Sequence, residues 1–253
     1  MTDKNFEKLN KKYIIKMSKD KNFQKLTKSW FKSSEIFQYS YHFSWLGRPI
    51  IQYPQDIVAL QELIWKIQPD LIIETGIARG GSLIFSASIL QLIGKGSVIG
   101  IDVDIRKPNR IEIEKHPMFK RIKMIEGSSI DEKIVKKVYR LAKNKKQILV
   151  ILDSNHSHKH VLKELELYSP LVTKNSYLIV FDTVIEDIST PKTLSHQKRL
   201  WGKGDNPKTA VKSFLKTNTR FVIDTEIENK LMITVAPSGF LKCIRNQNNT
   251  III

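Results

Sequence analysis

Two aspartates and one histidine follow apolar stretches of the chain and have the side chains that metal binding and proton transfer require. Asp153 and His156 come after residues 148–152, and Asp182 comes directly after residues 177–181. Two carboxylates at strand ends can share one hard cation such as Mg²⁺, with water or substrate oxygens in its other positions. A histidine beside them titrates near neutral pH and suits a general base. The pattern predicts Asp153 and Asp182 as metal ligands and His156 as the base.

Two other interpretations of these residues stay open on the sequence alone. Asp153 could cap a helix, with the histidines that follow it on a solvated face. His156 and His160, which are one helical turn apart, could instead bind zinc together with Asp153. The H-E-x-x-H pattern that would support zinc binding does not occur at these histidines.

A glycine-rich turn follows the apolar residues 71–73 and has the composition of a cofactor-binding loop. It contains Glu74, Gly76, Gly80 and Ser82. Glycines allow a tight turn and close approach of the backbone to a ligand, and the helix that starts at Ser82 offers free N–H groups. The spacing differs from G-x-G-x-x-G and no Walker lysine follows, so nicotinamide and nucleoside-triphosphate sites fit poorly. Glu74 would repel a pyrophosphate but could accept from an ammonium group; a structural turn without a ligand is the alternative.

An acidic residue and two serines follow the next two apolar stretches. Asp102 comes after residues 97–101, where a carboxylate can bind both hydroxyls of a ribose. Ser128 and Ser129 follow the third stretch, where the edge of an adenine ring would pass. The alternatives are a solvated acid at Asp102 and a helix-capping role for Ser129, with Glu132 three residues on.

Helical and strand patterns alternate from residue 53 onward and position these side chains. Apolar stripes, caps and breakers predict helices at residues 54–67, 82–93, 129 onward, 158–168 and 207–216. Short apolar runs predict strands at residues 71–73, 97–101, 122–125, 147–152 and 177–181, and then a hairpin of residues 220–224 and 231–235. This alternation predicts an α/β fold with a doubly wound, mostly parallel, seven-stranded sheet and an antiparallel C-terminal hairpin. Ligands bind such sheets at the carboxyl ends of the strands, where the candidate residues lie.

We expect three segments along the chain: an N-terminal helical and aromatic extension at residues 1–45, one α/β domain at residues 46–240, and a tail at residues 241–253. Apolar residues spaced by three or four predict a short amphipathic helix within residues 6–17. Aromatic residues alternate with mostly polar ones over residues 37–45. This run could be a strand or an aromatic lid, and it could cover the domain edge or wall a substrate pocket.

The composition is that of a globular protein with a large excess of positive charge. The 253 residues include 42 Lys+Arg and 25 Asp+Glu, which gives a formal net charge of +17. This charge permits contact with phosphates, nucleic acid or an anionic membrane face. The lysines are spread along the chain, form no known RNA-reading module, and equally fit a lysine-rich proteome. The single cysteine, Cys243, excludes an intramolecular disulfide, and we find no signal peptide or membrane span, so we expect a cytoplasmic protein.

Five motifs occur in the order and spacing of a known family. They are Glu74-Thr75-Gly76-x-x-x-Gly80-Gly81-Ser82, Gly100-Ile101-Asp102, Glu126-Gly127-Ser128-Ser129, Leu152-Asp153-Ser154-x-His156 and Asn206-Pro207-Lys208-Thr209-Ala210-Val211. Together they resemble the cephalosporin-hydroxylase-type family of class I S-adenosylmethionine-dependent O-methyltransferases, a group similar to rhamnosyl and macrolide-sugar O-methyltransferases. The resemblance covers residues 45–236 and implies a Rossmann-like methyltransferase fold that binds S-adenosylmethionine and Mg²⁺.

The resemblance implies a role for each candidate residue. The cofactor contacts that it implies are Glu74, Gly76 and Ser82 at the methionine end, Asp102 at the ribose, and Ser128 or Ser129 beside the adenine, with Gly80 and Asp153 also in contact. Its implied metal ligands are Asp153 and Asp182, and its implied base is His156. One departure concerns Phe181, because the family often has Glu-Asp where this chain has Phe-Asp. Water, or an acid at residues 186–187, would then have to supply the missing ligand.

We therefore predict an S-adenosylmethionine-dependent, Mg²⁺-assisted O-methyltransferase that acts on a hydroxyl of a sugar or of a glycan or glycolipid precursor. The polar segment 182–206 would be a substrate loop, and Trp45 and Trp201 could stack on a sugar face. Relatives of this type often assemble, so we expect a homo-oligomer. The alternatives are a methyltransferase that acts on RNA, although we do not expect nucleic acid as a partner, and a cofactor-binding domain without catalytic activity.

Overall fold

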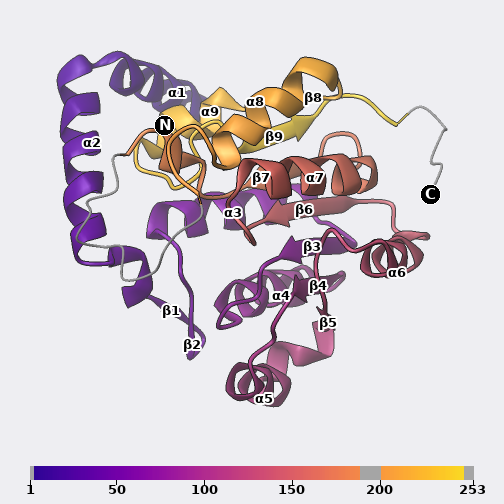
Figure 1. Ribbon diagram of the computed structural model, residues 1–253. Helices are drawn as coiled ribbons and strands as arrows, with labels where there is room; N and C mark the ends of the chain where they lie inside the picture. Colours follow the sequence, from indigo (N-terminus) through magenta and orange to yellow (C-terminus); the bar gives the residue numbers. More distant parts are fainter. Residues whose placement is uncertain (1–2, 189–200, 248–253) are drawn as a thin grey trace.

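A seven-stranded sheet lies between two layers of helices in the computed structural model, which describes residues 3–188 and 201–247 (Figure 1). The strands of this sheet are β3 (Leu71–Thr75), β4 (Ser97–Asp102), β5 (Ile122–Glu126), β6 (Ile148–Leu152), β7 (Tyr177–Val180), β8 (Phe221–Ile223) and β9 (Phe240–Cys243). Their order is β5-β4-β3-β6-β7-β9-β8. The first five strands pair in parallel, and β9 pairs antiparallel with both β7 and β8. The predicted fold class is confirmed.

Helices cover both faces of the sheet because successive strand residues point to opposite sides. The covering helices are α3 (Pro54–Ile67) and α4 (Gly81–Ile93) on one face, and α6 (Glu132–Ala142), α7 (His158–Tyr168) and α8 (Pro207–Thr217) on the other. Ile72 of β3 belongs to the first apolar core and its neighbour Ile73 to the second, and both are fully buried. Burial on both faces explains why the strands are continuous apolar runs instead of alternating patterns.

Local capping chemistry fixes several helix ends. The predicted limits of α7 and the predicted start of α8 are confirmed; the Asn206 side chain accepts hydrogen bonds from the first free N–H groups of α8. The predicted closure of α4 by Gly94 is also confirmed. The predicted capping by Ser129 is wrong, because Asp131 stands directly before α6 and its carboxylate accepts from two N–H groups there. Ser129 therefore lies outside the helix and is available for other contacts.

The C-terminal strand pair forms partly from residues other than those predicted. β8 falls within the predicted strand, but the second predicted strand, residues 231–235, is not one. Asp224 accepts a hydrogen bond from the N–H of Glu226 and starts the helix α9 (Thr225–Leu231). The chain therefore returns to the sheet only at Phe240, where β9 begins.

The N-terminal segment is helical and lies beside the domain (Figure 1). Its elements are α1 (Asp3–Lys19), α2 (Lys21–Ile36), the 3-10 turn η1 (Tyr39–His42), and the short strands β1 (Ser44–Trp45) and β2 (Arg48–Pro49). The helix predicted within residues 6–17 is part of α1. The aromatic run forms a turn and a small hairpin instead of one strand, and Tyr39 packs against Tyr53 and Trp30.

Some predictions about the extent of segments remain open. β9 extends to Cys243, which lies inside the predicted tail, and the division of the chain at residues 45 and 240 stays a prediction. Residues 189–200 of the predicted substrate loop lie outside the described residues. No helix among those that the structure describes is long and apolar enough to cross a bilayer.

Candidate active site

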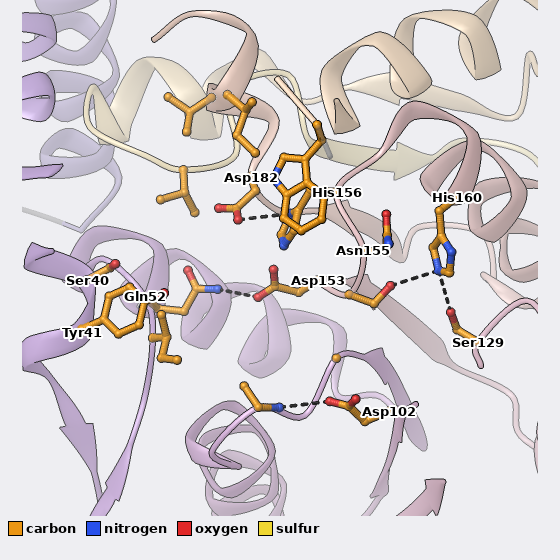
Figure 2. Close-up of a pocket in the computed structure, with 18 of the residues that line it drawn as sticks. Ser40, Tyr41, Gln52, Asp102, Ser129, Asp153, Asn155, His156, His160 and Asp182 are labelled. Atoms are coloured by element: carbon orange, nitrogen blue, oxygen red, sulfur yellow. Dashed lines mark hydrogen bonds and ion pairs between the residues drawn. The ribbon is translucent and has the colours of Figure 1, made fainter. Parts of the chain in front are cut away.

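A cavity of about 880 Å³ opens at the carboxyl ends of the parallel strands (Figure 2). Each of these strands contributes a lining residue at or just after its end: Gly76, Asp102, Ser128, Asp153 and Asp182. The parallel arrangement brings these ends to one edge of the sheet, which explains why residues far apart in sequence meet here. Ser129 and His156 also line this cavity.

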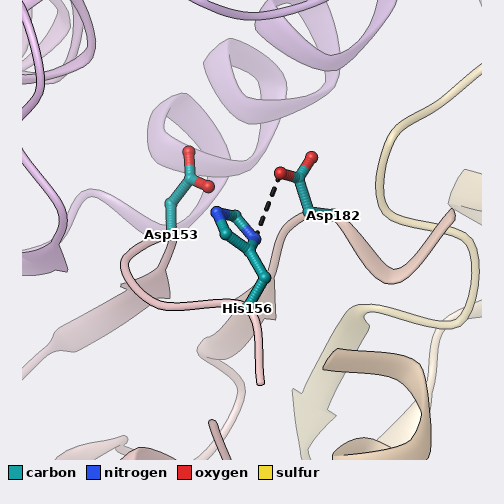
Figure 3. Close-up of side chains that lie close together, drawn as sticks. All are labelled: Asp153, His156 and Asp182. Carbon is teal, nitrogen blue, oxygen red and sulfur yellow. Dashed lines mark ion pairs between the residues drawn. The ribbon is translucent and has the colours of Figure 1, made fainter. Parts of the chain in front are cut away.

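Asp153, His156 and Asp182 form a compact cluster at the ends of β6 and β7 (Figure 3). One ligand atom from each residue lies within 4.8 Å of the others. His156 Nδ1 is 3.1 Å from Asp182 Oδ2. This contact holds the imidazole ring beside Asp182, and Nε2 is the ring nitrogen that it leaves available. The cluster can therefore hold a divalent cation or accept a proton.

Negative charge accumulates around Asp153. Burial raises the pKa of this carboxyl well above its ordinary value, and the nearby carboxylates of Asp182 and Glu74 raise it further. A hydrogen bond of 3.0 Å from Gln52 Nε2 to Asp153 Oδ2 acts in the opposite direction. Among the described residues, neither lysine nor arginine lines the cavity. Carboxylates without a cationic neighbour favour a bound cation, so the donor set fits a divalent metal ion.

The acids expected to supply a further metal ligand do not reach the cluster. Phe181, at the position of the missing ligand, is buried in the apolar core below α3 and α4. Glu186 accepts a 2.5 Å hydrogen bond from Asn206 Nδ2, and Asp187 pairs with a lysine of α8 at 2.5 Å. The expectation that residues 186–187 complete the metal site is therefore not met. His156 is the third potential donor in the described part of the chain.

The glycine turn after β3 packs directly against the loop after β6. Gly76 has a φ of +89°, and a Cβ there would lie 1.9 Å from the carbonyl oxygen of Asp153. A side chain at this position would be strained by the backbone conformation and would also collide with backbone atoms. Glycine is thus required where the two loops touch.

Glu74 lies behind this turn and is buried. The Ser82 hydroxyl donates a hydrogen bond to Glu74 Oε1, whereas Oε2 has no partner among the described residues. Burial raises the pKa of Glu74 to about 7. A buried carboxylate oxygen without a donor is costly unless a ligand supplies one, so the site fits the ammonium group of an amino-acid-like ligand.

Asp102 lines the cavity and also holds the glycine turn. Its Oδ2 accepts from the N–H groups of Ile77 at 2.8 Å and Ala78 at 3.2 Å, and its Oδ1 accepts from the N–H of Asp104 at 3.1 Å. A ribose would therefore share these carboxylate oxygens with the turn.

A hydrogen-bonded network that the sequence did not indicate lies beside Ser129. His160 Nε2 is 3.1 Å from Ser129 Oγ and 3.4 Å from Ser154 Oγ. Ser154 Oγ in turn donates at 2.7 Å to Glu164, which is fully buried. His160 belongs to this network and not to the acid–histidine cluster, so the structure does not support a zinc site shared by His156 and His160.

Several candidate residues lie outside the cavity lining. Glu74, Gly80 and Ser82 are absent from the residues that line it. Trp45 donates from its indole nitrogen to Ser88 Oγ at 3.0 Å and packs against α4, so it is not positioned to stack on a substrate. The structure thus assigns Trp45 a packing role instead of the predicted sugar contact.

The wall opposite the strand ends comes from the N-terminal segment. Glu35, Gln38, Ser40 and Tyr41 line it, which agrees with one of the two interpretations of the aromatic run (Figure 2). Sequence reasoning missed Gln52, the hydrogen-bond donor to Asp153. Its only signal is a polar residue in an otherwise apolar, proline-flanked stretch, and such a signal does not specify a role.

Comparison with known proteins identifies a family with the same features. The model of the family described as "Rhamnosyl O-methyltransferase/CmcI" matches residues 37–244. The chain is 34% identical over 196 residues to a rhamnosyl O-methyltransferase of Mycobacterium tuberculosis, covering 76% of this chain and 73% of that protein. It is 31% identical over 201 residues to a rhamnosyl O-methyltransferase of Mycobacterium leprae, covering 78% and 82%.

Solved structures share the fold at lower sequence identity. An apo structure of CmcI has a TM-score of 0.57 and 17% identity, covering 81% of this chain and 77% of that one. A CmcI structure with Mg and S-adenosylmethionine has a TM-score of 0.53 and 16% identity, covering 81% and 78%. An O-methyltransferase from Bacillus cereus in complex with S-adenosylhomocysteine has a TM-score of 0.50 and 14% identity, covering 80% and 82%.

Proposed function

Because the chain belongs to the rhamnosyl O-methyltransferase/CmcI family, we propose that it methylates a hydroxyl group of a sugar. The protein is an S-adenosylmethionine-dependent O-methyltransferase. One observation carries the choice of acceptor chemistry: the acid–histidine cluster lies in the same cavity as the glycine turn. Such a site can bind a methyl donor and remove a hydroxyl proton within the same cavity.

We assign the cofactor to the strand-end residues of β3, β4 and β5. When bound, S-adenosylmethionine supplies an electrophilic methyl group on its sulfonium. Glu74, whose Oε2 has no partner among the described residues, is the proposed acceptor for the ammonium group, and Gly76 lines the cavity beside it. Asp102 is the proposed partner of the ribose hydroxyls, and Ser128 and Ser129 are the proposed neighbours of the adenine edge; all three residues line the cavity.

His156 is the proposed base. Its Nδ1 is engaged by Asp182, so Nε2 can accept the proton of the acceptor hydroxyl. The hydroxyl oxygen then forms a bond to the methyl carbon as the carbon–sulfur bond breaks. Alignment of donor and acceptor in one cavity contributes several kcal/mol to such a displacement.

Asp153 and Asp182 are the proposed ligands of a divalent cation, with His156 within reach of the same point. A cation there would lower the pKa of the acceptor hydroxyl and offset the negative charge that collects at Asp153. Gln52 fixes one oxygen of Asp153, which leaves the other oxygen for the cation.

The acceptor side of the cavity includes Trp201, whose ring centroid is 5.2 Å from that of His156. An aromatic face beside the base suits the apolar face of a sugar ring. The polar and aromatic side chains of Ser40 and Tyr41 lie on the opposite wall. A glycan or glycolipid precursor is the proposed form of the acceptor.

Calorimetric titration with S-adenosylmethionine and S-adenosylhomocysteine, in Mg²⁺ and then in EDTA, tests the donor. We expect micromolar binding that persists in EDTA, because the proposed cofactor contacts need no metal. Transfer of labelled methyl groups to methyl rhamnoside, methyl glucoside and transfer RNA then tests the acceptor. We expect Mg²⁺-dependent labelling of a sugar.

The outcomes separate the alternatives. Labelling of transfer RNA alone would replace the sugar proposal with RNA methylation. Cofactor binding without transfer to any acceptor, with or without Mg²⁺, would support a domain that has lost catalysis. Failure to bind the cofactor in either condition would contradict the cofactor assignment.

A further inference from the structure

The first two helices carry a concentrated positive charge. Residues 1–36 contain ten lysines and four acidic residues, a net charge of +6 in the first seventh of the chain. All ten lysines are exposed. None of them forms an ion pair with an acidic side chain in the described ranges 3–188 and 201–247. This charge is thus available to a partner outside the chain.

The same helices expose large apolar side chains. On α2, Phe23, Leu26 and Trp30 have relative exposures of 38%, 63% and 39%, and Phe37, directly after the helix, is 70% exposed. The spacing of three and four residues places the three helical side chains along one stripe. α1 has no buried residue and exposes Phe6, Leu9 and Tyr13 at the same kind of spacing. Aromatic and leucine side chains in such a stripe lose contact with water only if another surface covers them.

Lysines form a second stripe on α2. Lys21, Lys25, Lys28 and Lys32 are spaced by four, three and four residues, and the exposed polar residues between the two stripes include Ser29. Thr27, Phe31 and Ser34, which are buried, attach the remaining face of α2 to the domain. The solvent side of the helix is therefore divided into an apolar part and a basic part, the pattern of helices that lie in a membrane interface.

We propose that the segment formed by α1 and α2 docks on an anionic lipid surface. The apolar stripe would enter the boundary between headgroups and acyl chains, and the lysines would contact the anionic headgroups. A second copy of this chain is a poorer occupant, because two such segments with a net charge of +6 each would repel. The docking does not depend on the proposed sugar acceptor, since it rests on charge and apolar exposure alone.

Docking would bring the cavity close to the membrane. Phe31 and Glu35 of α2 line the cavity, as do Gln38 and Tyr41 just after it. The helix that would lie on the lipid is therefore also part of the substrate wall (Figure 2). An acceptor carried by a membrane lipid would reach the cavity without leaving the surface.

Flotation of the full-length protein with vesicles tests the proposal. We expect binding to vesicles of phosphatidylcholine with 30% phosphatidylglycerol, little binding to pure phosphatidylcholine, and release of most protein at high salt. A variant with Lys21→Gln, Lys25→Gln, Lys28→Gln and Lys32→Gln should bind at least about ten-fold more weakly. A Leu26→Gln, Phe37→Gln variant should also lose at least about ten-fold.

Matched control variants distinguish an effect of the α1–α2 segment from a general effect of removing surface lysines or apolar side chains. The lysine control carries glutamine at four exposed lysines on or beside α6: Lys133, Lys137, Lys143 and Lys145. The apolar control is Leu92→Gln, at a residue of α4 that is 74% exposed. Both controls should retain most of the binding, and circular dichroism should show that every variant is folded. Equal loss in the controls, or no vesicle binding by the wild type, would overturn the proposal. A third result would also overturn the proposal. If light scattering showed a wild-type dimer, and the Leu26→Gln, Phe37→Gln variant were monomeric but bound vesicles as well as the wild type, the surface would belong to a second copy of the chain.

Discussion

At the residue scale, His156 is held so that one ring nitrogen is engaged and the other is available. His156 Nδ1 lies 3.1 Å from Asp182 Oδ2, and the ring of Trp201 packs beside the imidazole. This arrangement leaves Nε2 available for a base, and no hydrogen bond or ion pair joins His156 to the glycine turn among the described residues. The roles of proton removal and cofactor binding therefore reside in separate residues and can be tested separately.

Replacing His156 with alanine should reduce kcat by about 10²- to 10⁴-fold, because proton removal by a positioned base typically contributes that much. The affinity for S-adenosylhomocysteine should change by less than about three-fold, measured by calorimetry. His42→Ala, at an exposed histidine of η1, is the matched control and should leave kcat unchanged. If the His156→Ala variant also lost cofactor binding, the base assignment would be wrong and His156 would belong to the binding site.

Gly76→Ala and Gly94→Ala form a matched pair that isolates the contact between the two loops. Both glycines have a φ close to +88°, but only at Gly76 would a Cβ meet backbone atoms, whereas Gly94 has open space within 4 Å. Gly94→Ala should cost about 1 kcal/mol of unfolding free energy from the backbone conformation alone. Gly76→Ala should cost clearly more and weaken cofactor binding at least about ten-fold. Urea unfolding and calorimetry measure both effects; equal losses for the two variants would show that the contact is not rigid.

The sequence placed Asp153, His156 and Asp182 at one edge because parallel strands end together, and the structure brings them within one cluster. The sequence could not predict Gln52 or the His160 network. Gln52 reaches Asp153 across 101 positions of the chain, and no local pattern reports such a contact. The partners of polar side chains depend on tertiary packing, which residue type and spacing do not encode.

At the element scale, a buried acid connects α3 to the segment before β9. Asp56 of α3 accepts a hydrogen bond from the Thr234 hydroxyl and a 3.0 Å bond from the N–H of Val235. Burial raises the pKa of Asp56 to about 7 despite these two bonds. This connection fixes α3 relative to the C-terminal part of the sheet, and it makes their packing sensitive to pH.

The stability contributed by Asp56 should fall as pH rises from about 4 to about 7. In the unfolded chain this carboxyl loses its proton near pH 3.9, whereas the folded protein retains it to about pH 7. The contribution is fully present below pH 4 and is lost as pH passes the folded pKa. Asp56→Asn, whose amide can donate to Thr234 and accept from Val235, should remove this part of the pH dependence.

Urea unfolding at pH 4.5 and pH 7.5 checks this prediction. Relative to the wild type, Asp56→Asn should gain about 3 kcal/mol between the two pH values. Glu74 and Asp153 also have raised pKa values, so both the wild type and Asp56→Asn should keep the part of the pH dependence of stability that these two groups cause. Parallel pH profiles for the two proteins would contradict the prediction.

Element prediction succeeded where the determinants are local. The start of α8 follows from the adjacent Asn206 cap, and the strands follow from apolar runs that both faces bury. It failed for β9, because residues 231–235 are as apolar as a strand but a cap at Asp224 starts a helix first. Which of two apolar segments pairs with β7 depends on the path of the chain, and the sequence does not specify that path.

At the scale of the whole molecule, the net charge of +17 acts on stability as well as on binding. Like charges on a compact surface repel each other and favour the unfolded chain. Raising NaCl from about 20 to about 200 mM should therefore raise the melting temperature by about 2 °C or more, since the screening length shortens over this range. Differential scanning calorimetry measures the shift, and choline chloride should give the same result if screening is the cause. A fall in melting temperature would mean that local ion pairs outweigh the general repulsion.

The backbone contact between Gly76 and Asp153 also relates the two ligands that the site is proposed to bind. A ligand that orders one loop also restricts the conformations of the other loop, so the binding of either ligand lowers the entropic cost of binding the second. Thermodynamic reciprocity then requires a mutual benefit: the factor by which the cation tightens the cofactor equals the factor by which the cofactor tightens the cation. Any fixed order in which the two enter would be a matter of rates and not of affinity.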